Sequence, residues 1–196
     1  MSRGQLEFIK EQGIEPRQLI DCGVGEVGSE AWLAKELWPG IEVVGFEPNP
    51  DRLGLLAAAQ YPGWLFPLAV GAENCERTLK VFGEHLNGGF YWEYDVAIDH
   101  YVRMTRLDDT MSHRPDLSDA LLWLDIEGSE YAAIVGGQEM LKKCIAVVVE
   151  VRDEVPCPGW CTASEVAEIL KGAGFTKAKE FPSGPTDPQR DEVWLR

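Results

Sequence analysis

The fold of this chain is decided by the sequence LIDCGVGEVGS at residues 19–29. Its apolar start predicts a buried strand. The glycines after it predict a sharp turn, because a residue without a Cβ lets the backbone bend and lie close to a ligand. A helix beginning near Ser29 directs its free backbone N–H groups toward the same turn. This order of strand, turn and helix predicts one half of a nucleoside-binding crevice.

A carboxylate follows the next apolar run and predicts the other half of the crevice. Residues 43–50 read VVGFEPNP, so Glu47 ends a predicted strand about twenty residues after the glycines. An acid at this distance accepts hydrogen bonds from the two hydroxyls of a ribose. Pro48 and Asn49 come next, and Asn49-Pro50 is a typical helix start.

Asp21, two residues before the first glycine, helps to distinguish among the ligands that this turn could bind. Gly23-x-Gly25-x-x-Gly28 is compatible with NAD, FAD and S-adenosylmethionine alike. Asp21 ends the strand, where it would repel a pyrophosphate but suit the ammonium and sulfonium of S-adenosylmethionine. The alternative interpretation is that Asp21 caps the loop through backbone N–H groups.

The pattern of strands and helices predicts an α/β fold with a parallel sheet. We expect strands at 18–22, 41–46, 64–70, 120–126, 145–151, 175–181 and 191–196. We expect helices at 2–12, 29–38, 49–60 and 129–143, and another behind the capping box at 162–165. Residues 76–107 lack a helical period and are interpreted as an insertion over one sheet edge, within a single domain spanning residues 1–196. Inside that insertion, 77–82 alternates like an antiparallel or edge strand, Asn87-Gly88-Gly89 predicts a turn, and 102–107 predicts a short strand.

A second acidic group follows the strand expected at 120–126, in the sequence DIEGSE of residues 125–130. Alternation along that strand points Asp125 and Glu127 to the same side, and Gly128 permits a tight exit into a helix. This pair has three possible roles: binding a cationic cofactor, positioning a nucleophile or holding a metal ion. Glu130 suits the first turn of the helix, and Glu150 is a further acid at the same rim.

Composition excludes several classes of partner. A formal net charge of −15 disfavours binding to nucleic acid or to anionic lipid. The sequence has no apolar run long enough to span a bilayer, and its start lacks a secretory signal, so we expect a cytoplasmic protein. The five cysteines are expected to be reduced, and no metal site is expected from the Cys157–Cys161 pair.

These motifs together resemble the FkbM family of S-adenosylmethionine-dependent methyltransferases, from about residue 17 to 175. The resemblance is carried by residues 19–29 with 45–50, by 105–109, by 124–130 continuing to 141, and by 148–151. It implies a class I methyltransferase fold: a Rossmann-like, doubly wound, mostly parallel seven-stranded sheet with an antiparallel C-terminal strand. The sequence departs from the family pattern at Val24-Gly25-Glu26.

The resemblance also implies a cofactor site. Asp21, Gly23 and Gly25 would line the methionine part of S-adenosylmethionine, and Glu47 would hold the ribose. Ala69 would lie near the adenine, and Asp125 near the reactive centre. We expect Ser29, Pro48 and Asn49 to complete the site.

The implied reaction is in-line methyl transfer to the oxygen of a small-molecule or sugar hydroxyl. Asp125, Glu127 and His100 are candidate general bases. The aromatic residues at 90–94 are interpreted either as an acceptor pocket or as a seal for the sheet edge. Two other functions stay open: an NAD-dependent oxidoreductase, and a module that binds S-adenosylmethionine without turnover.

Overall fold

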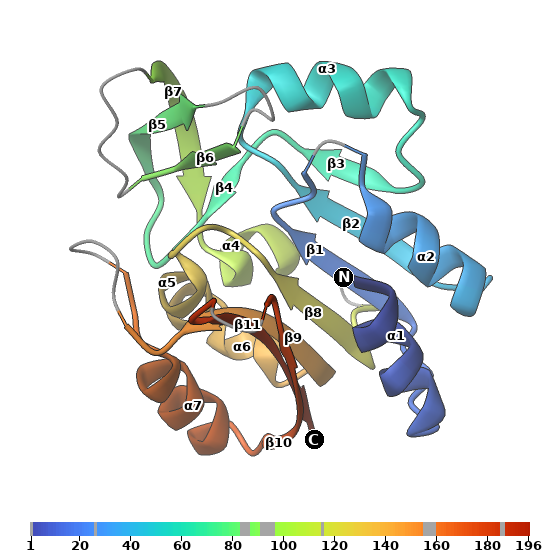
Figure 1. The fold of residues 1–196 in the computed structure, drawn as a ribbon. Coiled ribbons are helices and arrows are strands. Elements are labelled where there is room, and N and C mark those ends of the chain that lie inside the picture. Colours follow the sequence, from blue (N-terminus) through green and yellow to red (C-terminus); the bar gives the residue numbers. More distant parts are fainter. Residues whose placement is uncertain are drawn as a thin grey trace.

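The structure is a computed structural model that describes residues 2–25, 27–82, 87–90, 97–114, 116–154, 160–184 and 187–196. Its main sheet has seven strands in the order β10-β11-β9-β8-β1-β2-β3 (Figure 1). Their bounds are β1 Gln18–Cys22, β2 Glu42–Phe46, β3 Trp64–Phe66, β8 Ala120–Leu124, β9 Cys144–Arg152, β10 Thr176–Pro182 and β11 Gln189–Leu195. Strand β11 runs antiparallel to both of its neighbours, and the other pairings are parallel. The predicted fold class is confirmed.

Both faces of the sheet are buried under helices. Successive side chains of a strand point to opposite sides, so neighbouring residues enter different cores. Leu19 and Leu121 pack on one face with α1 (Ser2–Glu11) and α2 (Ser29–Leu37). Ile20 and Leu122 pack on the other face. That second core includes residues of α4 (Leu107–Met111), α5 (Glu130–Gly136), α6 (Gln138–Leu141) and α7 (Ala163–Gly172). Helix α3 (Pro50–Ala58) lies at the β3 end of the molecule (Figure 1).

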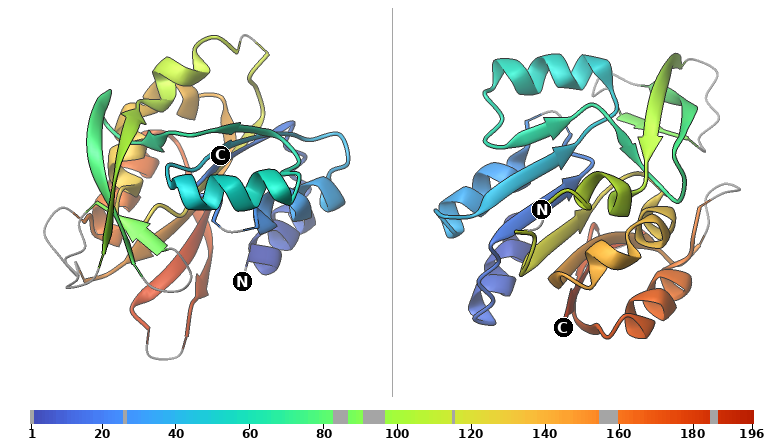
Figure 2. Two further views of the ribbon diagram at one scale, coloured as in Figure 1. Left: turned by 90° about the horizontal axis from the view of Figure 1, so that it is seen from above. Right: turned by 180° about the vertical axis from the view of Figure 1, so that it is seen from behind.

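The strand expected at 64–70 is wrong as a single element. It breaks at Pro67, which lacks a backbone donor, and continues as β4 (Ala69–Val70) in a second sheet. This sheet has the order β4-β7-β5-β6, with β5 Cys75–Phe82, β6 Asn87–Gly89 and β7 Ile98–Thr105. It stands beside the carboxyl ends of the main strands (Figure 2).

Three further expectations near this sheet change. The predicted turn at residues 87–89 is strand β6, because its backbone pairs with β5 from Lys80 to Phe82. The strand expected at 102–107 begins earlier, as β7, and helix α4 after it was not anticipated. The helix expected at 129–143 is divided in two, since α5 ends at Gly136 and α6 begins at Gln138.

The helix ends follow local sequence rules. Asn49 accepts a hydrogen bond from the Asp51 backbone N–H at 3.0 Å and caps α3. Thr162 and Glu165 form the predicted capping box of α7. Within the described ranges, no helix has both the length and the apolar character needed to cross a membrane.

Candidate functional site

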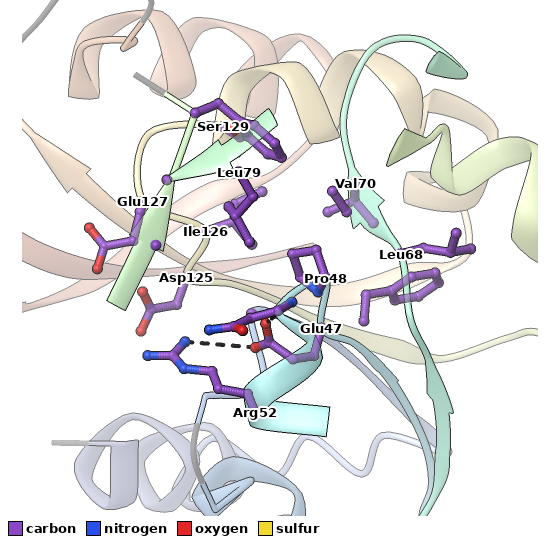
Figure 3. Close-up of a pocket in the computed structure, with 17 residues that line it drawn as sticks. Glu47, Pro48, Arg52, Leu68, Val70, Leu79, Asp125, Ile126, Glu127 and Ser129 are labelled. Carbon is purple, nitrogen blue, oxygen red and sulfur yellow. Dashed lines mark hydrogen bonds and ion pairs between the residues drawn. The ribbon is translucent and has the colours of Figure 1, made fainter. Parts of the chain in front are cut away.

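A cavity lies where the carboxyl ends of the main strands meet the second sheet (Figure 3). About 510 Å³ of space, part of it open to solvent, is bounded by the loops after β1, β2 and β8, by β4, and by β5 and β6. Leu79 and Phe90 form the wall on the side of the second sheet.

The glycine turn closes against the loop after β8. Gly23 has a φ of +87°, and a Cβ added there would lie 1.8 Å from the carbonyl oxygen of Asp125. The Gly23 N–H donates to the Phe46 carbonyl at 3.0 Å, and the Asp125 N–H donates to the Cys22 carbonyl at 3.1 Å. Only glycine fits this position, which brings the ends of β1, β2 and β8 together.

Glu47 lies at the end of β2 with only 2% of its surface exposed, and it lines the cavity. Its Oε1 accepts the Asn49 N–H at 2.8 Å, and its Oε2 accepts the Gly25 N–H at 3.2 Å. Burial raises the pKa of Glu47, while these hydrogen bonds and Arg52 oppose that shift. The glycine turn and the acid after β2 therefore form one unit, as their spacing predicts.

The other predicted cofactor residues divide into two groups. Pro48, Asn49 and Ala69 line the cavity with Gly23 and Asp125. Gly25 contributes through its N–H bond to Glu47 instead. Ser29 is exposed, and its hydroxyl donates to Glu30 at 2.9 Å, so it lies outside the lining.

Asp21 is fully buried and does not line the cavity. Its Oδ2 accepts the Tyr61 hydroxyl at 3.2 Å, and its Oδ1 has no hydrogen-bond partner among the described residues. Burial raises the pKa of Asp21, and nearby Glu30 adds to the shift. This partner could not be anticipated from the sequence, because Tyr61-Pro62-Gly63 indicates only the end of a helix.

Asp125 and Glu127 both line the cavity, as predicted. Their common side does not result from the alternation of side chains along a strand. Strand β8 ends at Leu124, and Glu127 lies in the following loop with a φ of +53°. Asp125 is open to the cavity on one side, and desolvation by the protein atoms around it raises its pKa. The charge of Glu127 raises that pKa further. Burial also raises the pKa of Glu127, against the opposing effect of Arg152 and Arg52. The loop thus places two carboxyl groups with elevated pKa values beside one cavity.

Glu130 holds this loop in shape. Its Oε1 accepts the N–H groups of Ile126 at 2.9 Å and of Gly128 at 3.2 Å. Gly128 has a φ of +98°, and a Cβ there would lie 2.4 Å from the Trp160 ring. The helix-dipole interpretation of Glu130 therefore omits its main contacts, which are with the backbone of the loop.

We expect Glu130→Gln to flatten the dependence of stability on pH. Burial raises the pKa of Glu130 to about 7, so the native state binds more protons than the unfolded state between the ordinary value and that pH. Stability is then lost as pH rises through this range, by about 3 kcal/mol for this group. The glutamine oxygen can accept the same two N–H groups without ionising.

Urea unfolding at pH 5 and pH 8 measures this difference. The variant should lose less stability than the unaltered protein between the two values, and Glu130→Ala should be less stable at both. Equal pH dependence in the unaltered protein and Glu130→Gln would contradict the assignment.

His100 lies outside the lining of the cavity. It is on β7, with its Nε2 3.5 Å from Oδ2 of Asp51. Its role as a base stays a prediction. Of the aromatic cluster, Phe90 lines the cavity and Tyr101 is 87% exposed, while Tyr91, Trp92 and Tyr94 lie outside the described residues.

The part of the chain that the structure describes contains no group of three or more His, Cys, Asp or Glu side chains placed to hold a metal ion. Cys157 lies outside the described residues, and Cys161 is partly buried with its thiol free.

Comparison with known proteins gives a family match over most of the chain. The family described as Methyltransferase FkbM domain matches residues 21–176. A protein named 2-O-methyltransferase NoeI, from Sinorhizobium fredii (strain NBRC 101917 / NGR234), is 25% identical over 191 residues, covering 85% of this chain and 75% of its own length.

Solved structures share the fold at low sequence identity. Magnesium protoporphyrin IX methyltransferase (ChlM) from Synechocystis PCC 6803, with bound SAM, aligns with a TM-score of 0.55 at 14% identity, covering 100% of this chain and 77% of that chain. A putative rRNA-methylase from Clostridium thermocellum aligns with a TM-score of 0.57 at 13% identity, covering 99% of this chain and 94% of that chain.

Proposed function

The chain belongs to the FkbM methyltransferase family and is an S-adenosylmethionine-dependent methyltransferase, and from this premise we propose that it methylates a hydroxyl oxygen of a small molecule or sugar. The family assignment favours methyl transfer over the oxidoreductase and the non-catalytic module. The name of the relative, a 2-O-methyltransferase, supports oxygen as the acceptor atom. The net charge of −15 disfavours a nucleic-acid acceptor. Residues 76–107 would then be an inserted wall of a single methyltransferase domain.

The observation that carries the proposal is the joint placement of Gly23, Glu47 and Asp125 around one cavity. Gly23 leaves room for close approach to the backbone. The buried Glu47 carboxylate presents acceptor oxygens for ribose hydroxyls. Asp21 also fits a cationic ligand, since its Oδ1 is buried without a donor among the described residues. It lies outside the cavity lining, so we propose that the positive charge of the ligand favours the ionised form of Asp21 and that the two attract each other through the field of that charge.

S-adenosylmethionine supplies a methyl group already activated by the sulfonium. The main task of the protein is to align the acceptor oxygen with the methyl carbon and sulfur, which can lower a barrier by roughly 7–11 kcal/mol. The acceptor oxygen forms its bond to carbon as the carbon–sulfur bond breaks, and the hydroxyl proton passes to Asp125 or Glu127. Because the pKa of each carboxyl is raised, it is a stronger base than an ordinary carboxylate once ionised.

The test is calorimetric titration with S-adenosylmethionine, S-adenosylhomocysteine and NAD, followed by a panel of hydroxyl metabolites and sugars with mass detection of methylated product. We expect binding of the first two compounds and a mass gain of one methyl group on a hydroxyl acceptor. Product on amines alone would overturn oxygen as the acceptor atom.

Glu47→Ala should weaken the binding of S-adenosylhomocysteine by about 1–3 kcal/mol, because the ribose loses its charged acceptor. Glu42→Ala is the matched control, since Glu42 lies at the opposite, amino end of β2. Unchanged affinity in a folded Glu47→Ala variant would mean that the ribose binds elsewhere.

A further inference from the structure

Arg52 stands out because it brings a positive charge into an acidic cavity. Among the described residues that line it, the charged ones are Arg52 and the carboxylates Glu47, Asp125 and Glu127. The Arg52 side chain is only 15% exposed. Figure 3 shows its guanidinium extending from α3 past Glu47 toward the side where Asp125 lies.

Helix stability does not explain this residue. Arg52 is in the first turn of α3, which begins at Pro50. The N-terminal end of a helix favours acids, and a cation there is locally unfavourable. The cap of this helix is already provided by Asn49.

The contact with Glu47 is an ion pair rather than a close hydrogen bond. Arg52 Nη1 lies 3.7 Å from Oε2 of Glu47, beyond ordinary hydrogen-bond length. A carboxylate offers about four acceptor positions. The N–H groups of Asn49 and Gly25 use one on each oxygen, so each oxygen keeps a position for a ribose hydroxyl.

We propose that Arg52 is a positioning residue for the cofactor: its charge keeps Glu47 ionised without occupying the two acceptor positions that the ribose hydroxyls need. The proposal rests on the proposed role of Glu47. It assigns to Arg52 the role of a positive charge beside Glu47, which the sequence pattern does not indicate.

Burial is what works against an ionised Glu47, and Arg52 opposes it. The charged groups around this pair come from several elements. Asp21 of β1 interacts with Glu47, and Glu127 of the loop after β8 interacts with Arg52 and with Arg152 of β9. Asp125 lines the same cavity, and Asp51 of α3 pairs with His100 of β7. Most of these are acids. Burial already raises the pKa of Glu47, and Arg52 opposes that shift. Without Arg52, Glu47 takes up a proton at a higher pH and loses an acceptor.

The test compares Arg52→Lys with Arg52→Gln by titration calorimetry with S-adenosylhomocysteine between pH 5.5 and 8.5. We expect the affinity of Arg52→Gln to fall below that of the unaltered protein as pH decreases, by about 10-fold for each unit by which the pKa of Glu47 is higher in the variant, and to approach it at the alkaline end of the range. Arg52→Lys keeps the charge and should stay within about threefold throughout. Arg103→Gln, an exposed residue of β7, removes the same charge away from the cavity and should match the unaltered protein.

Two results would overturn the proposal: equal affinities for Arg52→Gln and Arg52→Lys, or a loss in Arg52→Gln that does not change with pH. If Glu47→Ala binds normally while the unaltered protein binds the ligand, the role of Glu47 fails and this proposal fails with it. If only the Arg52 variants bind normally, the proposed function stands and Arg52 has no part in it.

Discussion

Gly23→Ala is expected to weaken the binding of S-adenosylhomocysteine about 100-fold or more and to lower the free energy of unfolding by about 3–5 kcal/mol. The added Cβ would lie 1.8 Å from the carbonyl oxygen of Asp125 and 2.8 Å from its carbonyl carbon. Both atoms are backbone, so relief requires β1 and β8 to separate at the point where the cofactor site forms. The φ of +87° adds strain that an alanine rarely accepts.

Gly13→Ala is the matched control for backbone strain. Gly13 has a φ of +74°, and no atom lies within 4 Å of a Cβ placed there. It ends α1, away from the cavity, so its alanine variant should lose only about 1–2 kcal/mol of stability and no affinity. Urea unfolding and calorimetry on both variants make the comparison. If the two variants behave alike, the close packing of Gly23 on Asp125 is not what the site depends on.

Asp125→Asn is expected to lower kcat/KM for methyl transfer by about 100-fold or more, in the range found for loss of a general base. Asp125 lines the cavity and is accessible to solvent there, so the amide should fold normally. Because the pKa of Asp125 is raised, activity of the unaltered protein should increase with pH as this group ionises. The variant should lose that dependence.

Asp153→Asn serves as the control for net charge. Asp153 follows β9, is 68% exposed and pairs with Arg190 outside the cavity. Its variant should retain full turnover on the acceptor that the metabolite panel identifies. Normal turnover in Asp125→Asn would leave Glu127 as the base and make Asp125 a structural residue.

Sequence alone was sufficient where a local rule or a two-faced strand sets the outcome. The runs at 18–22 and 120–124 are buried throughout, and all of their residues except Gln18 and Asp21 are apolar. Such continuous apolar runs indicate strands that are covered on both faces. The caps of α3 and α7 follow from Asn49-Pro50 and from Thr162 with Glu165. Because parallel strands end at one edge, the same patterns also brought Gly23, Glu47 and Asp125 to one site.

Tertiary structure decided the contacts made between segments that are distant in sequence. β4 and β6 are too short to show a period, and they exist because β7 and β5 pair with them. The Tyr61 hydroxyl on Asp21 and the Arg52 charge beside Glu47 depend on where α3 and its following loop pack. Glu127 lies beyond the end of the strand, and its own left-handed backbone conformation sets its orientation. Glu130 stabilises that loop by accepting the Ile126 N–H. Periodicity describes one segment at a time, whereas these positions are fixed by backbone pairing and burial between segments.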